Sequence, residues 1–136
     1  MRAKLICYWV ATTLIGLETL AGGATDLMHG RTSLASGPFV LDVITHLGYP
    51  SYFLVILGIW KLLGGIVLFA PGLPRLKEWA YAGIFFELTG ATASFVLHGD
   101  PASDWAAPFV LAILAVLSWA LRPPNRVLGL LFAQTA

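Results

Sequence analysis

Charged side chains are scarce in this sequence, and their scarcity excludes whole classes of protein. Eight Lys or Arg and seven Asp or Glu occur in 136 residues, so 11% of the chain is charged and 58% is hydrophobic. A soluble domain has about 25% charged residues, and a water-facing surface cannot be built from so few. The composition predicts a polytopic membrane protein. The net charge of +1 gives no reason to expect a nucleic-acid partner.

Cysteine and the usual cofactor motifs are also lacking. The single cysteine, Cys7, excludes an internal disulfide and a cysteine-based metal site. No dinucleotide-binding glycine motif occurs, and we expect no flavin, haem or other cofactor. No stretch between the apolar segments is long enough to fold alone, so residues 1–136 are expected to form a single domain.

Long apolar runs are what the chain has in abundance. Four of them have about the 20 residues that a transmembrane helix needs, at 5–28, 52–70, 79–98 and 105–121. Prolines break the chain after the second, third and fourth runs, at Pro71, Pro101 and Pro123. Because backbone groups in lipid must be satisfied within their own segment, the runs predict an all-α bundle of four transmembrane helices.

The basic residues indicate how these helices cross the membrane. One side carries six of them and the other side carries only Arg31. The six are Arg2, Lys4, Arg75, Lys77, Arg122 and Arg126. Because Lys and Arg concentrate in cytoplasmic loops, both termini are predicted to be cytoplasmic.

Two apolar segments that begin with a carboxylate resemble each other. They read "ETLAGGATDLMHG" from Glu18 and "ELTGATASFVLHG" from Glu87. In both, a histidine follows eleven residues after the glutamate, and eleven steps of about 100° return to nearly the same helix face. Both helices are predicted to run outward from the cytoplasm. The match favours a parallel repeat of two helical hairpins, as some transporters have, with coincidence as the alternative.

A lysine in the second apolar run, Lys61, lies at about the same depth as Glu18 and Glu87. An ionised side chain at the centre of a bilayer costs about 2.5–3.5 kcal/mol on insertion scales, so three separate charges would be expensive. We therefore predict that Glu18, Lys61 and Glu87 meet in the core of the bundle. Because two carboxylates repel each other at short range, we expect one glutamate to be protonated.

Glycines surround this lysine, and two interpretations of the predicted centre are open. Gly58, Gly64 and Gly65 lie three or four residues from Lys61, where small residues let helices approach closely. The Glu–Lys–Glu centre is either a structural lock that specifies helix partners or a functional centre that relays protons or contacts a small molecule. Three ionisable groups exceed what a lock requires, but no catalytic residue is assigned.

A second set of polar residues is expected at the outer rim of the bundle. It consists of Asp26, His29, Asp42, His46, His98, Asp100 and Asp104. Histidines beside carboxylates are residue types that bind zinc or transfer protons. Their spacing matches no metal-binding pattern, so we predict no metal site, with His29, His98 and Asp100 as weak candidates.

Three stretches resemble the DoxX-like membrane proteins: "YFLVILGIWKLLGGIVL", the "PGLP" turn, and "LKEWAYAGIFFELTGA" with its later "HGD". The likeness extends over most of the chain, and the third stretch is its most specific part. The resemblance implies a four-helix protein of the bacterial inner membrane. Glu18, Lys61, Glu87 and Gly90 match positions where the family pattern carries polar or small residues.

The resemblance also implies a place beside redox enzymes, because the family takes its name from a subunit of an archaeal thiosulfate:quinone oxidoreductase. We therefore expect an accessory or partner subunit of a redox-linked membrane complex. Its partner would be an oxidoreductase subunit or a second copy of the chain. The alternatives are a pathway for protons or small molecules, and an intramembrane enzyme acting on a quinone or another hydrophobic substrate. Whether the chain is an enzyme is left open.

Overall fold

The structure, a computed structural model, describes residues 2–28 and 40–128. Regular structure in these two ranges is entirely helical. The elements are α1 (Arg2–Leu27), α2 (Val40–His46), α3 (Phe53–Phe69), α4 (Pro74–His98), α5 (Ala102–Ala120) and the 3-10 turn η1 (Pro124–Arg126). The all-α fold that the sequence predicts is confirmed over the described residues.

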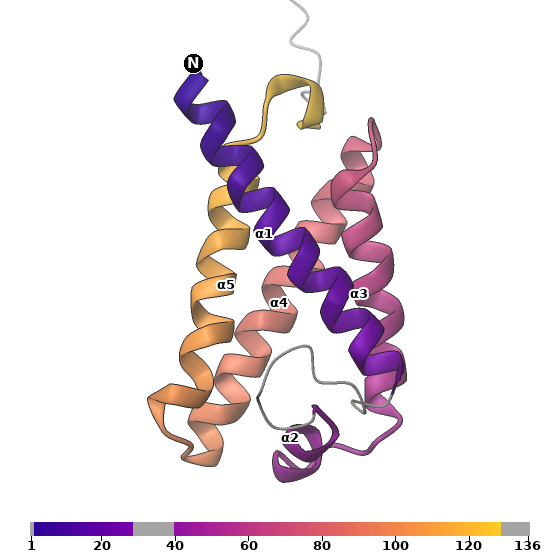
Figure 1. The fold of residues 1–136 in the computed structure, drawn as a ribbon, viewed down its shortest axis with the longest axis vertical. Coiled ribbons are helices and arrows are strands. Elements are labelled where there is room, and N and C mark those ends of the chain that lie inside the picture. The colour runs from indigo at the N-terminus through magenta and orange to yellow at the C-terminus, as the bar shows by residue number, and fades with distance from the viewer. Residues whose placement is uncertain (1, 29–39, 129–136) are drawn as a thin grey trace, which may run out of the picture.

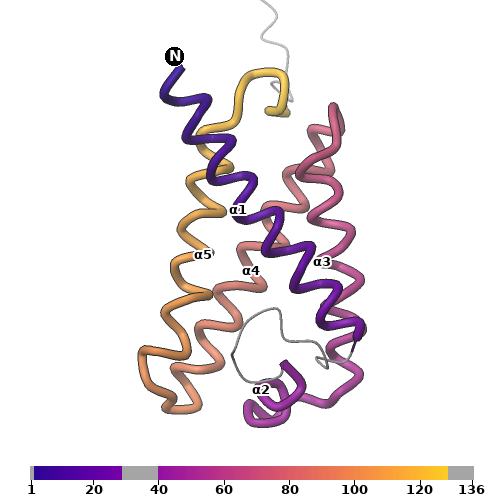
Figure 2. The backbone as a smooth tube through the Cα atoms, viewed as in Figure 1, coloured from indigo at the N-terminus to yellow at the C-terminus, as the bar shows by residue number. Residues whose placement is uncertain are grey.

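The four long helices form a bundle in which each packs against two neighbours. Helix α1 contacts α3 and α5, and α4 contacts the same two helices. Successive helices run in opposite directions: α1 and α4 descend in Figure 1, whereas α3 and α5 ascend. The backbone tube in Figure 2 follows the same path. The start of α1 and the turn η1 therefore lie at one end of the bundle, and α2 lies at the other end.

Three helices, α1, α4 and α5, are long and apolar enough to cross a membrane. The chain is thus a multi-pass membrane protein. Helix α3 is shorter, with 17 residues, and it extends about 26 Å at 1.5 Å per residue. The hydrocarbon core of a bilayer is about 30 Å thick. A fourth crossing by α3 therefore stays a prediction.

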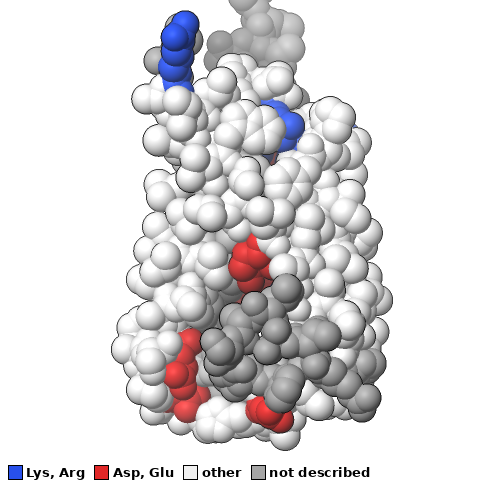
Figure 3. All heavy atoms as spheres, viewed as in Figure 1, with Lys and Arg blue, Asp and Glu red and all other residues white. Residues whose placement is uncertain are grey.

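The outer surface of the bundle suits a lipid environment. Large apolar side chains are exposed on every long helix, for example Leu14 of α1, Trp60 of α3, Phe86 of α4 and Phe109 of α5. On the face drawn in Figure 3, Lys and Arg lie at the end that carries the start of α1. Asp and Glu lie in the middle of that face and at the opposite end, and the other described residues on it are uncharged.

Proline and glycine set the limits of α4. Pro74 occupies its first turn, where the missing N–H leaves no hydrogen bond unmade. The helix therefore begins at residue 74 rather than at the predicted residue 79. At the other end, Gly99 has a φ of 90° and donates its amide to the carbonyls of Phe95 and Val96, a conformation that glycine adopts without strain.

The sequence does not predict α2. Its seven residues lie between two apolar runs, and so short a helix gives almost no periodic signal. Ile44 is buried and α2 contacts α1. Helix α2 therefore packs against the end of the bundle opposite the start of α1.

Glycines bring α1 and α3 into close contact. A Cβ atom added to Gly23 would lie 2.8 Å from Cβ of Lys61 and 3.0 Å from the carbonyl oxygen of Gly58. A Cβ on Gly65 would meet a leucine side chain of α1 at 2.6 Å. The predicted close approach is confirmed at Gly58 and Gly65. It is wrong at Gly64, where the nearest atoms would be 4.0 Å away.

Two basic side chains, one buried and one half-buried, close the end of the bundle that carries η1. Lys77, which is 1% exposed, donates to the carbonyls of Val67 and Ala70 at the end of α3. Arg126 donates to the carbonyl of Leu68. The last carbonyls of a helix have no partner within the helix. These cations therefore cap α3, in addition to any part they play in orienting the chain.

Candidate functional site

Two ion pairs in the interior of the bundle meet at Lys61. Its Nζ atom lies 2.9 Å from Oδ2 of Asp26 and 2.9 Å from Oε1 of Glu87. The three residues come from α3, α1 and α4, and their side chains are 15%, 1% and 23% exposed in that order. We call Asp26, Lys61 and Glu87 the Lys61 cluster.

Glu18 lies beside this cluster but outside its ion pairs. A Cβ on Gly22 would meet Lys61 Nζ at 3.4 Å and Glu18 Oε1 at 3.6 Å, so the two groups flank the same glycine. Among the described residues, Glu18 makes no ion pair. Of the predicted trio, the structure therefore brings Lys61 and Glu87 into contact and leaves Glu18 as their neighbour.

The expected position of Asp26 at the outer rim is wrong. Asp26 is 1% exposed, because α1 stays helical through Leu27 and turns this carboxylate toward α3. The sequence does hold a signal for it. Asp26 follows Glu18 by eight residues, two steps of four along one helix face, within the same apolar run.

A cavity of about 310 Å³ adjoins the Lys61 cluster. The cluster supplies its charged groups, and Ser94 and Tyr49, whose hydroxyls are 2.8 Å apart, supply further polar groups. The rest of the lining is mainly apolar and comes from α2, α3 and α4, including Phe53, Phe86, Phe95 and residues of α2. Sites for small molecules have this size and this mixture of an apolar wall with a few placed polar groups.

Hydrogen-bond donors and acceptors face each other in this cavity wall. An ammonium group has three N–H donors, and the two carboxylates take two of them. The carboxylates are acceptors with spare lone pairs. A ligand carbonyl could accept from Lys61, and a ligand hydroxyl could donate to Glu87. The arrangement is suited to holding an oxygen-bearing head group next to an apolar body.

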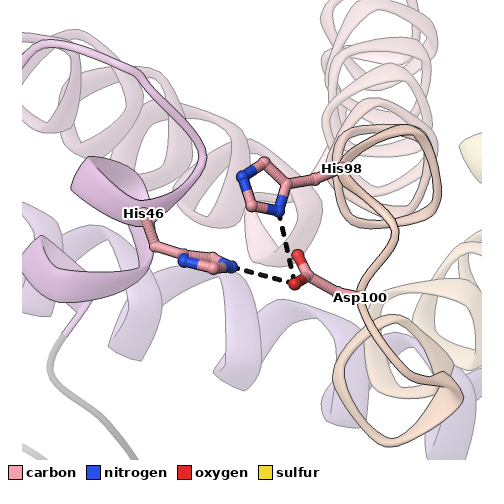
Figure 4. Close-up of side chains that lie close together, drawn as sticks. All are labelled: His46, His98 and Asp100. Atoms are coloured by element: carbon pink, nitrogen blue, oxygen red, sulfur yellow. Dashed lines mark hydrogen bonds and ion pairs between the residues drawn. The ribbon is translucent and has the colours of Figure 1, made fainter.

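A second polar cluster lies at the end of the bundle where α2 packs. Nε2 of His46 lies 2.9 Å from Oδ1 of Asp100, and Nδ1 of His98 lies 3.4 Å from the same oxygen. Figure 4 shows both rings turned toward the carboxylate, His46 from α2 and His98 from the end of α4. The hydrogen bonds from His46, and then from His98, hold the pKa of Asp100 below its ordinary value.

The other predicted rim residues divide between these two clusters and the surface. Of the weak metal candidates, His98 and Asp100 lie together, and His29 lies outside the described residues. Asp104 accepts a hydrogen bond from Ser103 at 2.8 Å. His46, which no local sequence pattern connects with His98, joins them only through the packing of α2.

Comparison with known proteins points to one family. A model of the DoxX-like family matches residues 10–118. The match includes every residue of the Lys61 cluster, and it also includes His46, His98 and Asp100. No curated protein and no solved structure matches the chain.

Proposed function

The chain belongs to the DoxX-like family, and from this premise we propose that it binds a small amphiphilic molecule in the cavity beside the Lys61 cluster. The observation that carries the proposal is the conjunction of buried ion pairs and a cavity of about 310 Å³ in one place. Ionisable groups inside a membrane bundle are costly and commonly mark substrate or ion pathways.

The chemistry of the cavity favours a quinone-like ligand. A quinone carbonyl accepts a hydrogen bond, as Lys61 requires, and the hydroxyl of the reduced form donates one, as Glu87 requires. The aromatic side chains of Phe53, Phe86 and Phe95 line the same space and offer surfaces for a planar ring. Other apolar molecules with a carbonyl or hydroxyl head belong to the same chemical class.

A role as partner subunit follows from this ligand. Reduction of a quinone needs an electron donor, and we propose that an oxidoreductase subunit supplies the electrons while this chain holds the quinone. A second copy of the chain is the alternative partner. We place the protein in the bacterial inner membrane, with both termini in the cytoplasm.

The cavity can be closed without disturbing the ion pairs. Gly90 lines the cavity, and a Cβ added there would meet nothing within 4 Å. The variant Gly90→Leu places a side chain in the ligand's space. Gly83→Leu is the matched control, because Gly83 is on the same helix, is equally open and does not line the cavity.

Binding of decylubiquinone to the full chain in lipid nanodiscs tests the proposal. Calorimetry, with lipid-only nanodiscs as the blank for partitioning, should show saturable binding to the wild type and to Gly83→Leu. Gly90→Leu should bind at least about tenfold more weakly, a loss of about 1.4 kcal/mol. Uptake that does not saturate, or that is equal in all three proteins, would overturn the proposal for quinones.

The proton-pathway alternative draws on the same cluster. Glu18, Asp26 and Glu87 outnumber the single cation Lys61 here, and crowded carboxylates share protons. Liposomes that carry the wild-type chain would then take up protons faster than liposomes that carry Glu87→Gln. Equal rates would discard this alternative and leave the quinone site untouched.

A further inference from the structure

The His46 cluster, formed by His46, His98 and Asp100, draws together three segments at one end of the bundle. His46 ends α2, His98 ends α4, and Asp100 lies in the turn that leads to α5. The two imidazole rings are 4.3 Å apart between their centroids. Both histidines remain about half exposed, at 52% and 41%, so the cluster is accessible from water.

The separations between these side-chain atoms match those of metal ligands. Zinc binds histidine nitrogens and carboxylate oxygens at about 2.0–2.2 Å in a tetrahedron, which places neighbouring ligand atoms about 3.3 Å apart. The nitrogen–oxygen distances here are 2.9 and 3.4 Å. One atom from each of the three residues lies within 4.8 Å of the other two. Small side-chain rotations would therefore place the three ligand atoms at three corners of a tetrahedron around one ion.

An unsatisfied carboxylate oxygen is a second, independent indication that a cation binds here. Oδ2 of Asp100 is buried and has no hydrogen-bond partner among the residues that the structure describes, while Oδ1 accepts hydrogen bonds from both histidines. The Asp100 side chain is only 11% exposed. An acceptor that is out of contact with water and has no partner is unfavourable, and more so when it is charged. A bound cation would remove this cost, because it interacts with the whole carboxylate.

We propose that His46, His98 and Asp100 bind a zinc-class divalent cation at this end of the bundle. The ligands are Nε2 of His46, Nδ1 of His98 and the Asp100 carboxylate, with water in the remaining position. Two neutral imidazoles and one carboxylate are a ligand set that suits zinc and similar ions. The ion ties α2 to the turn between α4 and α5.

Zinc chloride titrated into the full chain tests this site. The protein is purified without a histidine tag, stripped with EDTA and kept in detergent at pH 7.5, where imidazole is mostly neutral. Calorimetry should show one zinc ion per chain. Cobalt(II) in place of zinc should give the intense visible absorption of a tetrahedral site.

Two variants separate a metal site from a simple hydrogen-bonded contact. In His98→Gln the amide can still donate to Asp100 but is a poor metal ligand, so zinc affinity should fall at least about tenfold while the thermal midpoint without metal changes little. Asp104→Asn removes a nearby carboxylate that is outside the cluster, and it should bind zinc like the wild type.

The proposal is overturned if the wild type binds no zinc at stoichiometric level. It is equally overturned if zinc binds the wild type and His98→Gln alike, because the ion then lies elsewhere. In either case the cluster is a hydrogen-bonded contact that holds α2 in place.

Discussion

At the scale of single residues, one lysine organises the charged interior. Lys61 would be a costly residue in the hydrocarbon region without a partner, and it has two, Asp26 and Glu87. Removal of one partner from a buried pair is strongly destabilising, because the other charge is left uncompensated. The order of importance among the carboxylates therefore follows their contacts and not their spacing in the sequence.

Asp26 should matter more to stability than Glu18. We expect Asp26→Asn to lower the free energy of unfolding by about 1.5–3 kcal/mol, the range for a hydrogen bond to a charged group. Glu18→Gln should change it by less than about 0.5 kcal/mol, because Glu18 makes no described ion pair. Unfolding in mixed detergent with increasing dodecyl sulfate, followed by circular dichroism, measures both. Equal losses of unfolding free energy in the two variants would contradict the prediction that Asp26 stabilises the fold more than Glu18.

At the scale of elements, the contact between α1 and α3 depends on the absence of side chains. Gly23 of α1 and Gly58 of α3 face each other next to the Cβ atom of Lys61. Without a hydrophobic driving force in lipid, helices associate through close packing of small residues. The same glycines place the backbone of α1 close enough for Asp26 to reach Lys61. The close packing of α1 against α3 is therefore also what makes the ion pair between Asp26 and Lys61 possible.

Two alanine substitutions distinguish this contact from helix propensity. Gly23→Ala adds a methyl group 2.8–3.0 Å from α3 atoms, so overpacking should lower stability by about 1–3 kcal/mol. Gly64→Ala meets nothing closer than 4.0 Å and should be neutral or stabilising by up to about 1 kcal/mol. The same unfolding assay provides the measurement. If Gly23→Ala is as stable as the wild type, the stability of the protein does not depend on the close contact between α1 and α3.

At the scale of the whole molecule, the alternating helix directions place both ends of the described chain on one side (Figure 1). The basic residues predict that this side is the cytoplasm. Alkaline phosphatase, which is active only outside the cytoplasm, should be inactive when fused to either terminus. A fluorescent reporter that folds in the cytoplasm should be bright at both. Opposite results at the two ends would mean an odd number of crossings.

The proposed internal repeat also belongs to this scale. Helices α1 and α4 both bring a glutamate of the matched segments to the neighbourhood of Lys61. Of the two glutamates only Glu87 pairs with Lys61, and the position that matches its second partner, Asp26, is occupied by Phe95 in the other segment. The two halves therefore differ at the ion pairs themselves, and the duplication stays a prediction.

Much of the architecture is determined by the sequence alone. Length and apolar character decide where helices form, because a backbone in lipid must satisfy its own hydrogen bonds. The observed limits of α3 and α5, at 53–69 and 102–120, accordingly lie within three residues of the predicted 52–70 and 105–121. The cost of buried charge also requires Lys61 to have a carboxylate partner.

Only the tertiary structure decided which groups meet. The choice of Asp26 over Glu18 depends on the crossing of α1 and α3 at their glycines, and a side-chain reach of a few ångströms cannot be read from spacing along one helix. The meeting of His46 with His98 and Asp100 depends on how α2 packs, and its seven residues carry too little periodicity to predict that. Contacts between segments distant in the chain are set by the packing of whole helices, which no local pattern encodes.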